Sequence, residues 1–206
     1  PEDPGNSAWR STMNSERVLM SDMAGAARMP VVRVGDTAKI VRSFLCAMNV
    51  VIRRAEVRDV PRMYELVKEL ALFERAPNEV TVTLEHMHEA GFGPDPVWVA
   101  WVAEVEGKVQ GMALCYVRYS TWKGRRLYLE DIVVSEGQRG RRIGERLFMA
   151  CVEHAVAMGH SGMQWQVLDW NTEAVRFYDR FGTRYDDQWR NGSLEHHDLR
   201  ALLDRK

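Results

Sequence analysis

The segment Leu127-Tyr-Leu-Glu-Asp-Ile-Val-Val134, followed by Glu136-Gly-Gln-Arg-Gly-Arg-Arg-Ile-Gly144, decides the fold of this chain. The first stretch is apolar apart from two adjacent carboxylates, which predicts a buried strand. The second is a turn rich in glycine and arginine, and the apolar residues of 143–158 then recur at helical spacing. A strand that leads through such a turn into a helix predicts an α/β protein.

The apolar pattern on either side of this unit predicts one domain, a mixed central β-sheet flanked by helices. The expected strands are Val50–Arg54, Val97–Val105, Lys108–Tyr116, Leu127–Val134, Met163–Leu168 and Tyr185–Leu194. The expected helices are Asp59–Phe73, Leu84–Ala90, Ile143–Met158, Thr172–Phe181 and His197–Leu203. Glu106-Gly107, between two of the strands, predicts a tight hairpin turn.

The composition argues against several classes of protein. The 28 basic and 29 acidic side chains nearly cancel, which disfavours nucleic acid or an anionic membrane as the main partner. The longest apolar run, Val97–Val105, is too short to span a bilayer. Cys46, Cys115 and Cys151 are far apart in the sequence and form no CxxC pair, so we expect structural thiols in a reducing cytoplasm. The histidines lack metal-ligand spacing, and no bound metal is expected.

Residues 1–47 differ from the rest of the chain. They carry four methionines and mix small and polar residues without a sustained period. We expect a disordered or non-native N-terminal extension, followed by a folded domain at 48–206. An amphipathic targeting peptide over Arg28–Arg42 is the alternative, although Glu16, Asp22 and Asp36 are unusual in such a peptide.

The glycine-rich turn has the composition of an anion site. Glycines let backbone N–H groups approach a phosphate closely, and the N-terminus of the following helix adds its positive dipole end. The turn matches neither the P-loop nor the dinucleotide fingerprint. It therefore predicts either a pyrophosphate cradle or a basic turn that holds no ligand.

Glu130 and Asp131 are adjacent carboxylates within a strand that is otherwise apolar. Burying them is costly unless they are hydrogen bonded, paired or functional. Because side chains alternate along a strand, the two should face opposite sides of the sheet unless a β-bulge re-aims one. They predict either a site for a cationic substrate, with one carboxylate relaying a proton through water, or a structural network with arginines.

A third motif follows the strand expected at Met163–Leu168. Asn171 is placed to cap the next helix, on which Ala174, Phe177, Tyr178 and Phe181 form one apolar stripe. Tyr178 is therefore either a core residue or a phenol that protonates a departing thiolate.

These motifs together resemble the GNAT acetyl-CoA-dependent N-acetyltransferases, and most closely their diamine branch of spermidine/spermine and thialysine type. The resemblance covers about Val50–Leu203. It rests on five segments in the same order and spacing: Gly91-Phe-Gly-Pro-Asp-Pro96, Tyr119-Ser-Thr-Trp-Lys-Gly124, Leu127-Tyr-Leu-Glu-Asp131, Arg139-Gly140 with Ile143-Gly144, and Val167-Leu-Asp-Trp-Asn171.

The resemblance implies a role for each candidate residue. Acetyl-CoA would be held through its pyrophosphate by Arg139, Gly140, Arg141, Arg142, Ile143 and Gly144, with Asn171 and Tyr178 on the cofactor side. The amides of Ile132, Val133 and Val134 could polarise the thioester carbonyl. Tyr178 would be the acid for the thiolate and Glu130 the water-mediated base. Asp131, Glu74 and Trp122 would contact the amine. A homodimer is implied by resemblance alone.

Two residues depart from the family pattern. Arg142 stands where the usual motif has glycine, and Ser120 stands where spermidine-type enzymes can carry an acid. The second difference favours a shorter or amino-acid-like amine over a long polyamine.

The expected function is direct transfer of an acetyl group, within a ternary complex, to a primary amine of a small cationic molecule: a diamine, a polyamine or a lysine-like amino acid. One alternative is a catalytically silent CoA-binding sensor or interaction module. The other is an acetyltransferase for protein N-termini or lysines, which would need an open peptide groove.

Overall fold

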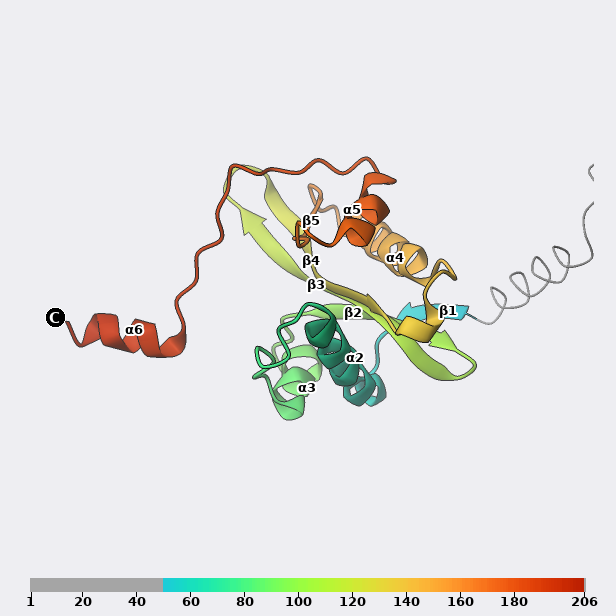
Figure 1. The fold of residues 1–206 in the computed structure, drawn as a ribbon, viewed down its shortest axis with the longest axis horizontal. Helices are drawn as coiled ribbons and strands as arrows, with labels where there is room; N and C mark the ends of the chain where they lie inside the picture. Colours follow the sequence, from blue (N-terminus) through green and yellow to red (C-terminus); the bar gives the residue numbers. More distant parts are fainter. Residues whose placement is uncertain (1–49, 206) are drawn as a thin grey trace, which may run out of the picture. The chain divides into compact units, whose positions relative to one another are not determined.

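The computed structural model describes residues 50–205, which form one five-stranded sheet with helices on both faces (Figure 1). The strands are β1 (Val50–Arg54), β2 (Val99–Val105), β3 (Lys108–Ser120), β4 (Gly124–Val134) and β5 (Met163–Gln164). The helices are α2 (Val60–Phe73), α3 (Leu84–Phe92), α4 (Ile143–Ala157), α5 (Thr172–Asp179) and α6 (His196–Leu203), with short 3-10 turns at Val57–Asp59 and Glu136–Gln138. The predicted mixed α/β fold is confirmed.

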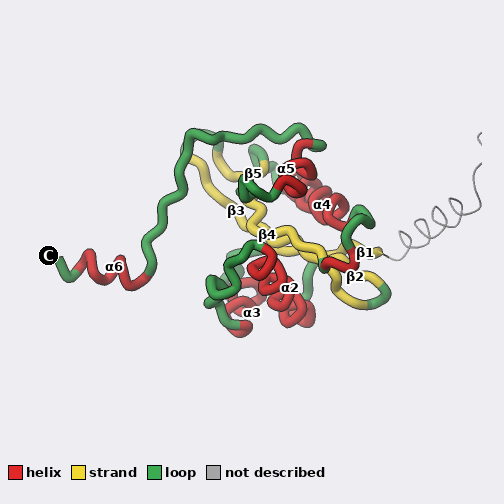
Figure 2. The backbone as a smooth tube through the Cα atoms, viewed as in Figure 1, coloured by secondary structure: helices red, strands yellow, loops and turns green. Residues whose placement is uncertain are grey.

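The sheet runs in the order β1-β2-β3-β4-β5, antiparallel throughout except for the parallel pair β4–β5. Helices α2 and α3 cover one face, and α4 and α5 cover the other (Figure 2). The first face buries Met63 and Leu66 of α2, and the second buries Leu147 and Cys151 of α4. Successive side chains of each strand face opposite sides of the sheet, so they contribute in turn to one apolar layer and to the other.

The predicted hairpin turn at Glu106-Gly107 is present. The φ angles of 51° and 75° at these two residues are both positive, as a two-residue hairpin turn requires. The turn pairs Val105 of β2 with Lys108 of β3, and an irregularity between Ala103 and Glu104 then shifts the register of the rest of β2 on β3.

Two of the predicted strands differ from the structure: one is shorter than expected and the other is absent from the described residues. The strand expected at Met163–Leu168 is reduced to Met163–Gln164, and the one expected at Tyr185–Leu194 does not form. Residues 184–197 are all exposed and have no ladder partner among the described residues. A β-like pattern reports a propensity, whereas a strand also needs a neighbouring strand for its backbone groups.

Cys115 of β3 and Cys151 of α4 lie together in the core, with their Sγ atoms 3.5 Å apart. The neighbouring thiol of Cys151 and burial both raise the pKa of Cys115, which keeps it protonated and unreactive. Their prediction as structural residues is consistent with this position, while the cytoplasmic setting stays a prediction. The expected extension at 1–47, and Cys46 within it, lies outside the described residues. None of the helices in 50–205 is long and apolar enough to cross a lipid bilayer.

Candidate active site where β4 and β5 diverge

The parallel ladder between β4 and β5 is very short. It consists of two register pairs, Leu127–Met163 and Tyr128–Gln164, whereas β4 continues to Val134. The edge of β4 over 129–134 therefore has no strand partner on the β5 side within the described part of the chain. Because ladder hydrogen bonds alternate sides along a strand, only every second residue of this segment, which includes the candidates Ile132, Val133 and Val134, presents its backbone groups to the open edge, where an extended ligand can reach them.

A β-bulge in β4 lies at Glu130. Leu129 pairs with Cys115 of β3, and Asp131 pairs with the preceding residue Leu114, so Glu130 is the extra residue. The bulge reverses the alternation of the strand. Before it, Leu127 and Leu129 pack against the α4 layer; after it, Val133 packs against the α2 layer and its neighbours Ile132 and Val134 against α4.

The bulge places Asp131 and Glu130 on the same face of the sheet, the face covered by α2. Asp131 is opposite Leu114, which belongs to the α2 layer, and interacts with Glu74 at the C-terminus of α2. Glu130 interacts with Tyr116 and Tyr128, which stack on the same face with ring centroids 5.0 Å apart. Three acidic side chains from two elements therefore form one cluster.

Asp131 has the most perturbed carboxyl group of this cluster. It is half-buried, and burial first, then the charges of Glu130 and Glu74, raise its pKa to about 6. Burial also raises the pKa of Glu74. Glu130 is exposed. A carboxyl group that titrates near neutral pH can accept a proton and release it again, as a general base must.

Tyr178 lies beneath the cluster on the α4 side of the sheet. It is 5 % exposed, and its ring packs on Trp165 at 4.8 Å and on Phe148 at 5.8 Å, so the predicted apolar stripe is confirmed. Burial raises the pKa of Tyr178, and the charge of Asp131 contributes to this shift. The phenol is therefore protonated at neutral pH and lies within electrostatic range of the acidic cluster.

The glycine-rich turn joins β4 to α4. Gly140 has a φ of 76° and Arg142, the residue before α4, has a φ of 59°. No side chain caps the N-terminus of α4, and Ile143, 1 % exposed, anchors the turn in the core. The first N–H groups of the helix are thus left for an anion. Arg142 replaces the family's usual glycine yet keeps a backbone conformation that glycine favours.

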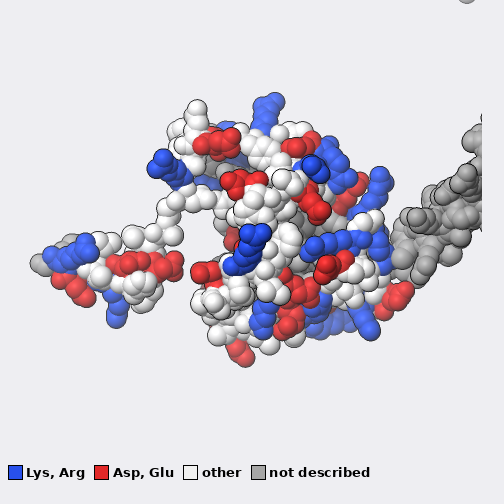
Figure 3. All heavy atoms as spheres, viewed as in Figure 1, with Lys and Arg blue, Asp and Glu red and all other residues white. Residues whose placement is uncertain are grey.

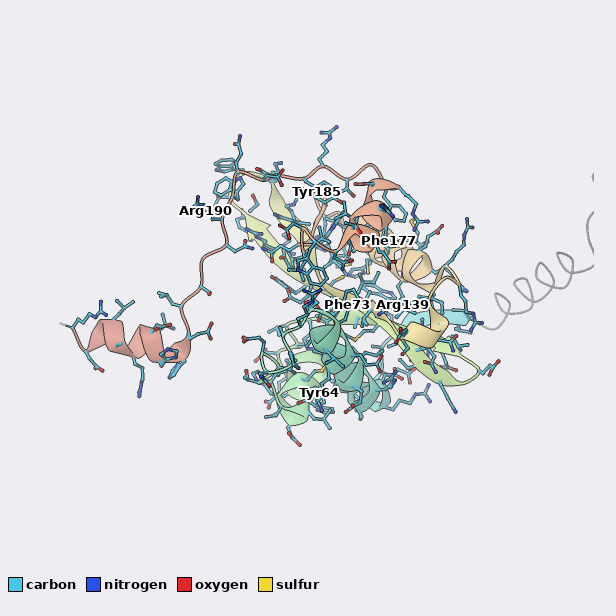
Figure 4. All side chains as sticks on the ribbon, viewed as in Figure 1. Tyr64, Phe73, Arg139, Phe177, Tyr185 and Arg190 are labelled. Atoms are coloured by element: carbon cyan, nitrogen blue, oxygen red, sulfur yellow. The ribbon has the colours of Figure 1, made fainter. Side chains whose placement is uncertain are left out.

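The arginines of the turn have different partners. Arg141 donates to the side chain of Gln138, and Arg142 lies 3.8 Å from Glu145 while remaining exposed. Arg139 donates to the carbonyl of Val134, and its guanidinium lies 5.3 Å from the ring centroid of Phe73 in α2 (Figure 4). Arg139 therefore connects the turn to the helix that also carries Glu74.

Asn171 performs the predicted capping function, because its Oδ1 accepts a hydrogen bond of 3.1 Å from the backbone N–H of Ala174. Trp122 is more remote. It lies at the tip of the β3–β4 hairpin and is 84 % exposed. The strand between Gly124 and Glu130 spans about 20 Å at 3.3 Å per residue, so the structure does not bring Trp122 to the acidic cluster. Its contact with the amine stays a prediction.

Sequence reasoning missed the aromatic residues around this site. Tyr116 and Tyr128 are register partners, and Phe73 and Trp170 meet with ring centroids 6.0 Å apart. The register of β3 on β4 would have identified the first pair. The second pair joins the end of α2 to the loop before α5, two segments far apart in the sequence, and leaves no local signal. Elsewhere on the surface, basic and acidic side chains are interspersed on the face shown (Figure 3), as the balanced composition predicts.

This geometry agrees with comparisons to known proteins. The model of the acetyltransferase (GNAT) family matches residues 60–183, which include α2, the bulge, the glycine-rich turn and α5. The chain belongs to the GNAT family of acetyltransferases. GNAT proteins are acyltransferase enzymes, and the relatives described next are N-acetyltransferases by name.

The chain is similar to GNAT enzymes of the predicted branch. A thialysine N-epsilon-acetyltransferase of Bos taurus is 37 % identical over 143 residues, which are 66 % of this chain and 84 % of the relative. A human spermidine/spermine N(1)-acetyltransferase-like protein is 32 % identical over 138 residues, 64 % of this chain and 20 % of the relative. An aminoglycoside N-acetyltransferase solved in complex with CoA shares the fold, with a TM-score of 0.58 and 16 % identity over 70 % of this chain and 94 % of its own.

Proposed function

We propose that this GNAT enzyme transfers an acetyl group from acetyl-CoA directly to a primary amine of a small cationic molecule: a diamine, a polyamine or a lysine-like amino acid. The observation that carries the proposal is the bulge at Glu130. It brings two carboxylates to one face of β4, beside an open strand edge and across the sheet from a buried phenol. A cation site and a proton donor on the same strand suit amine acetylation.

The turn and the open edge fit a CoA thioester. The uncapped N-terminus of α4, with Gly140 and Gly144 beside it and Arg139, Arg141 and Arg142 around it, suits the pyrophosphate. The free edge of β4 suits the amides of the pantetheine arm, and Asn171, at the start of α5, and Tyr178, near its end, are the proposed contacts on the cofactor side. Acetyl-CoA, when bound, supplies the thioester; among Ile132, Val133 and Val134, the amides that face the open edge are the proposed donors to its carbonyl.

The acidic cluster accounts for capture and deprotonation of the amine. A primary ammonium group, with a reference pKa near 10.4, must lose a proton before it attacks a carbonyl. Glu130 faces solvent and is the predicted base acting through water. Asp131, with its pKa raised to about 6, is a second candidate for the same proton. Glu74, from α2, adds a third negative charge to hold the cation.

Tyr178 is the proposed acid for the departing thiolate. Its hydroxyl is protonated at neutral pH because burial raises its pKa, and its ring is held by Phe148 and Trp165. With a base and an acid both supplied by this chain, transfer needs no covalent enzyme intermediate.

A homodimer is part of the proposal. After Tyr185, which donates to the carbonyl of Val175, the chain exposes large apolar side chains: Trp189 is 73 %, Leu194 57 % and Leu203 67 % exposed. Exposed apolar residues in such number favour a protein partner. A second copy of this chain supplies one, and light scattering of the purified protein would report twice the mass of the chain.

The proposed function is tested with a panel of amines. Acetyl-CoA is mixed with lysine, ornithine, cadaverine, spermidine and a lysine-containing peptide, and CoA release is followed with a thiol reagent. Release with one or more of the small amines, above that with the peptide and with acetyl-CoA alone, is expected. Release with the peptide only, or with none of them, would contradict the proposal.

A further inference from the structure

Arg118 is a basic residue of β3 on the face of the sheet that also carries Glu130 and Asp131, and it lies beside the Tyr116–Tyr128 pair. It follows Tyr116 by two residues, so the two side chains lie on the same face of the strand. Its guanidinium carbon lies 5.9 Å from the ring centroid of Tyr128. The charge of Glu130 raises the pKa of both tyrosines, whereas that of Arg118 lowers it, so both charges act on the same aromatic pair.

Arg118 makes no ion pair with a carboxylate of residues 50–205. Its guanidinium therefore keeps its donors for a carboxylate that comes from elsewhere. Arg53 and Arg62 of the same domain contrast with it, since each is held by carboxylates of its own chain. The guanidinium fork is well suited to bind a carboxylate through two parallel hydrogen bonds.

The spacing of the charges fits a small zwitterion. The guanidinium lies at the level of Tyr128, which precedes Glu130 by two residues and Asp131 by three. At about 3.3 Å per strand residue, the cation and the carboxylates are separated by roughly 7–10 Å along β4. An extended lysine-type side chain places its terminal amine and its α-carboxylate about that far apart. Tyr116 and Tyr128 would pack against its methylene groups.

We propose that Arg118 binds the α-carboxylate of a basic amino acid while its terminal amine lies at Glu130 and Asp131, which makes Arg118 the residue that selects amino acids over polyamines. This inference rests on the proposed function. Lysine also carries an ammonium group at its α-carbon, but the α-carboxylate beside it offsets that charge. A diamine of the same length brings its second ammonium group toward the guanidinium with no carboxylate to offset it. The next residue of β3 on the same face is the neutral Ser120, and the register partner of Arg118 on β4 is Arg126, which donates to the carbonyl of Met163. Arg118 therefore has no acidic neighbour at these two positions.

The test compares three amines that differ only at the α-carbon: lysine, lysinamide, which lacks the carboxylate charge, and cadaverine, which lacks the whole group. Arg118→Met removes the charge and keeps most of the side-chain length. Arg125→Met is the matched control, because Arg125 is an exposed arginine of the adjacent strand whose register partner, Tyr119, faces the opposite side from Arg118.

Arg118→Met should lower kcat/KM for lysine by about 10- to 100-fold, the effect of losing a charged hydrogen bond. The value for cadaverine should rise, and that for lysinamide should change less than that for lysine. Arg125→Met should leave the ratio of lysine to cadaverine at the wild-type value. Equal changes for lysine and cadaverine, or no change in Arg118→Met, would overturn the role of Arg118 while leaving acetyl transfer intact. A wild-type protein that acetylates none of the three amines would instead contradict the proposed function, and this inference with it.

Discussion

Asp131→Asn should make the protein more stable and less active at the same time. In the folded protein, burial and the charges of Glu130 and Glu74 raise the pKa of this carboxyl from 3.8 to about 6. Since the raised pKa disfavours the ionised form in the folded state, folding becomes less favourable as the pH rises from about 4 to 6. An asparagine has nearly the same shape and carries no charge, so it removes this cost.

The size of the effect follows from the two pKa values. At 1.36 kcal/mol per pKa unit, the shift from 3.8 to about 6 corresponds to about 3 kcal/mol of lost stability above pH 7. At pH 4.5 the same relation leaves about 1 kcal/mol. For a domain of this size, about 3 kcal/mol corresponds to a rise in melting temperature of roughly 6–12 °C.

The assay is urea unfolding of the wild type and Asp131→Asn at pH 8 and pH 4.5, together with kcat/KM for an amine at pH 8. Asp95→Asn, a change at an exposed loop aspartate, is the control and should have no effect at either pH. A stability gain that is equal at both pH values would refute the electrostatic reasoning. A variant that is stabilised as expected but acetylates amines at the wild-type rate would remove Asp131 from the substrate site.

Three further changes test other parts of the account. Tyr178→Phe keeps the aromatic packing but removes the proposed acid, so kcat should fall by about 10²–10⁴-fold with little change in melting temperature; turnover at the wild-type rate would leave Tyr178 as a core residue only. Arg142→Gly should change the free energy of unfolding by no more than about 1 kcal/mol, since the strain relieved at a φ of 59° offsets the added chain entropy. Arg142→Val should be clearly less stable than Arg142→Gly in the same thermal melt, and equal melts would show that this backbone conformation is not strained. Removal of residues 1–47 should leave acetyl transfer nearly unchanged in a steady-state assay, because every candidate site residue lies beyond them; an unfolded or inactive product would show that the domain needs them.

Much of the fold could be predicted because its signals are local. The helices α2 and α4 and the strands β1 to β4 follow from apolar spacing and from turn residues, as at Glu106-Gly107. The strand expected at Tyr185–Leu194 shows where this reasoning ends. Its pattern is suited to a strand, but a ladder partner is a property of the fold and not of the segment.

The site could be predicted only as a set of residues. Glu130, Asp131 and Tyr178 were all candidates, yet the spatial relation of the first two depends on a bulge that exists only in the pairing of β4 with Leu114 and Cys115 of β3. A single sequence does not specify that register. For the same reason the raised pKa of Asp131 could not be predicted, since it depends on burial in the fold, on the charge of Glu130 that the bulge brings to the same face, and on the charge of Glu74, more than fifty residues earlier in the chain.

The central claim is that the carboxylates brought together by the bulge serve the amine and not the cofactor. The most direct measurement is made on the double variant Glu130→Gln/Asp131→Asn, for which both the Kd of acetyl-CoA and kcat/KM for the best amine of the panel are determined. The account predicts a Kd close to that of the wild type and a loss of kcat/KM of at least about 100-fold. A double variant that acetylates the amine at the wild-type rate, or that loses acetyl-CoA binding instead, would contradict it.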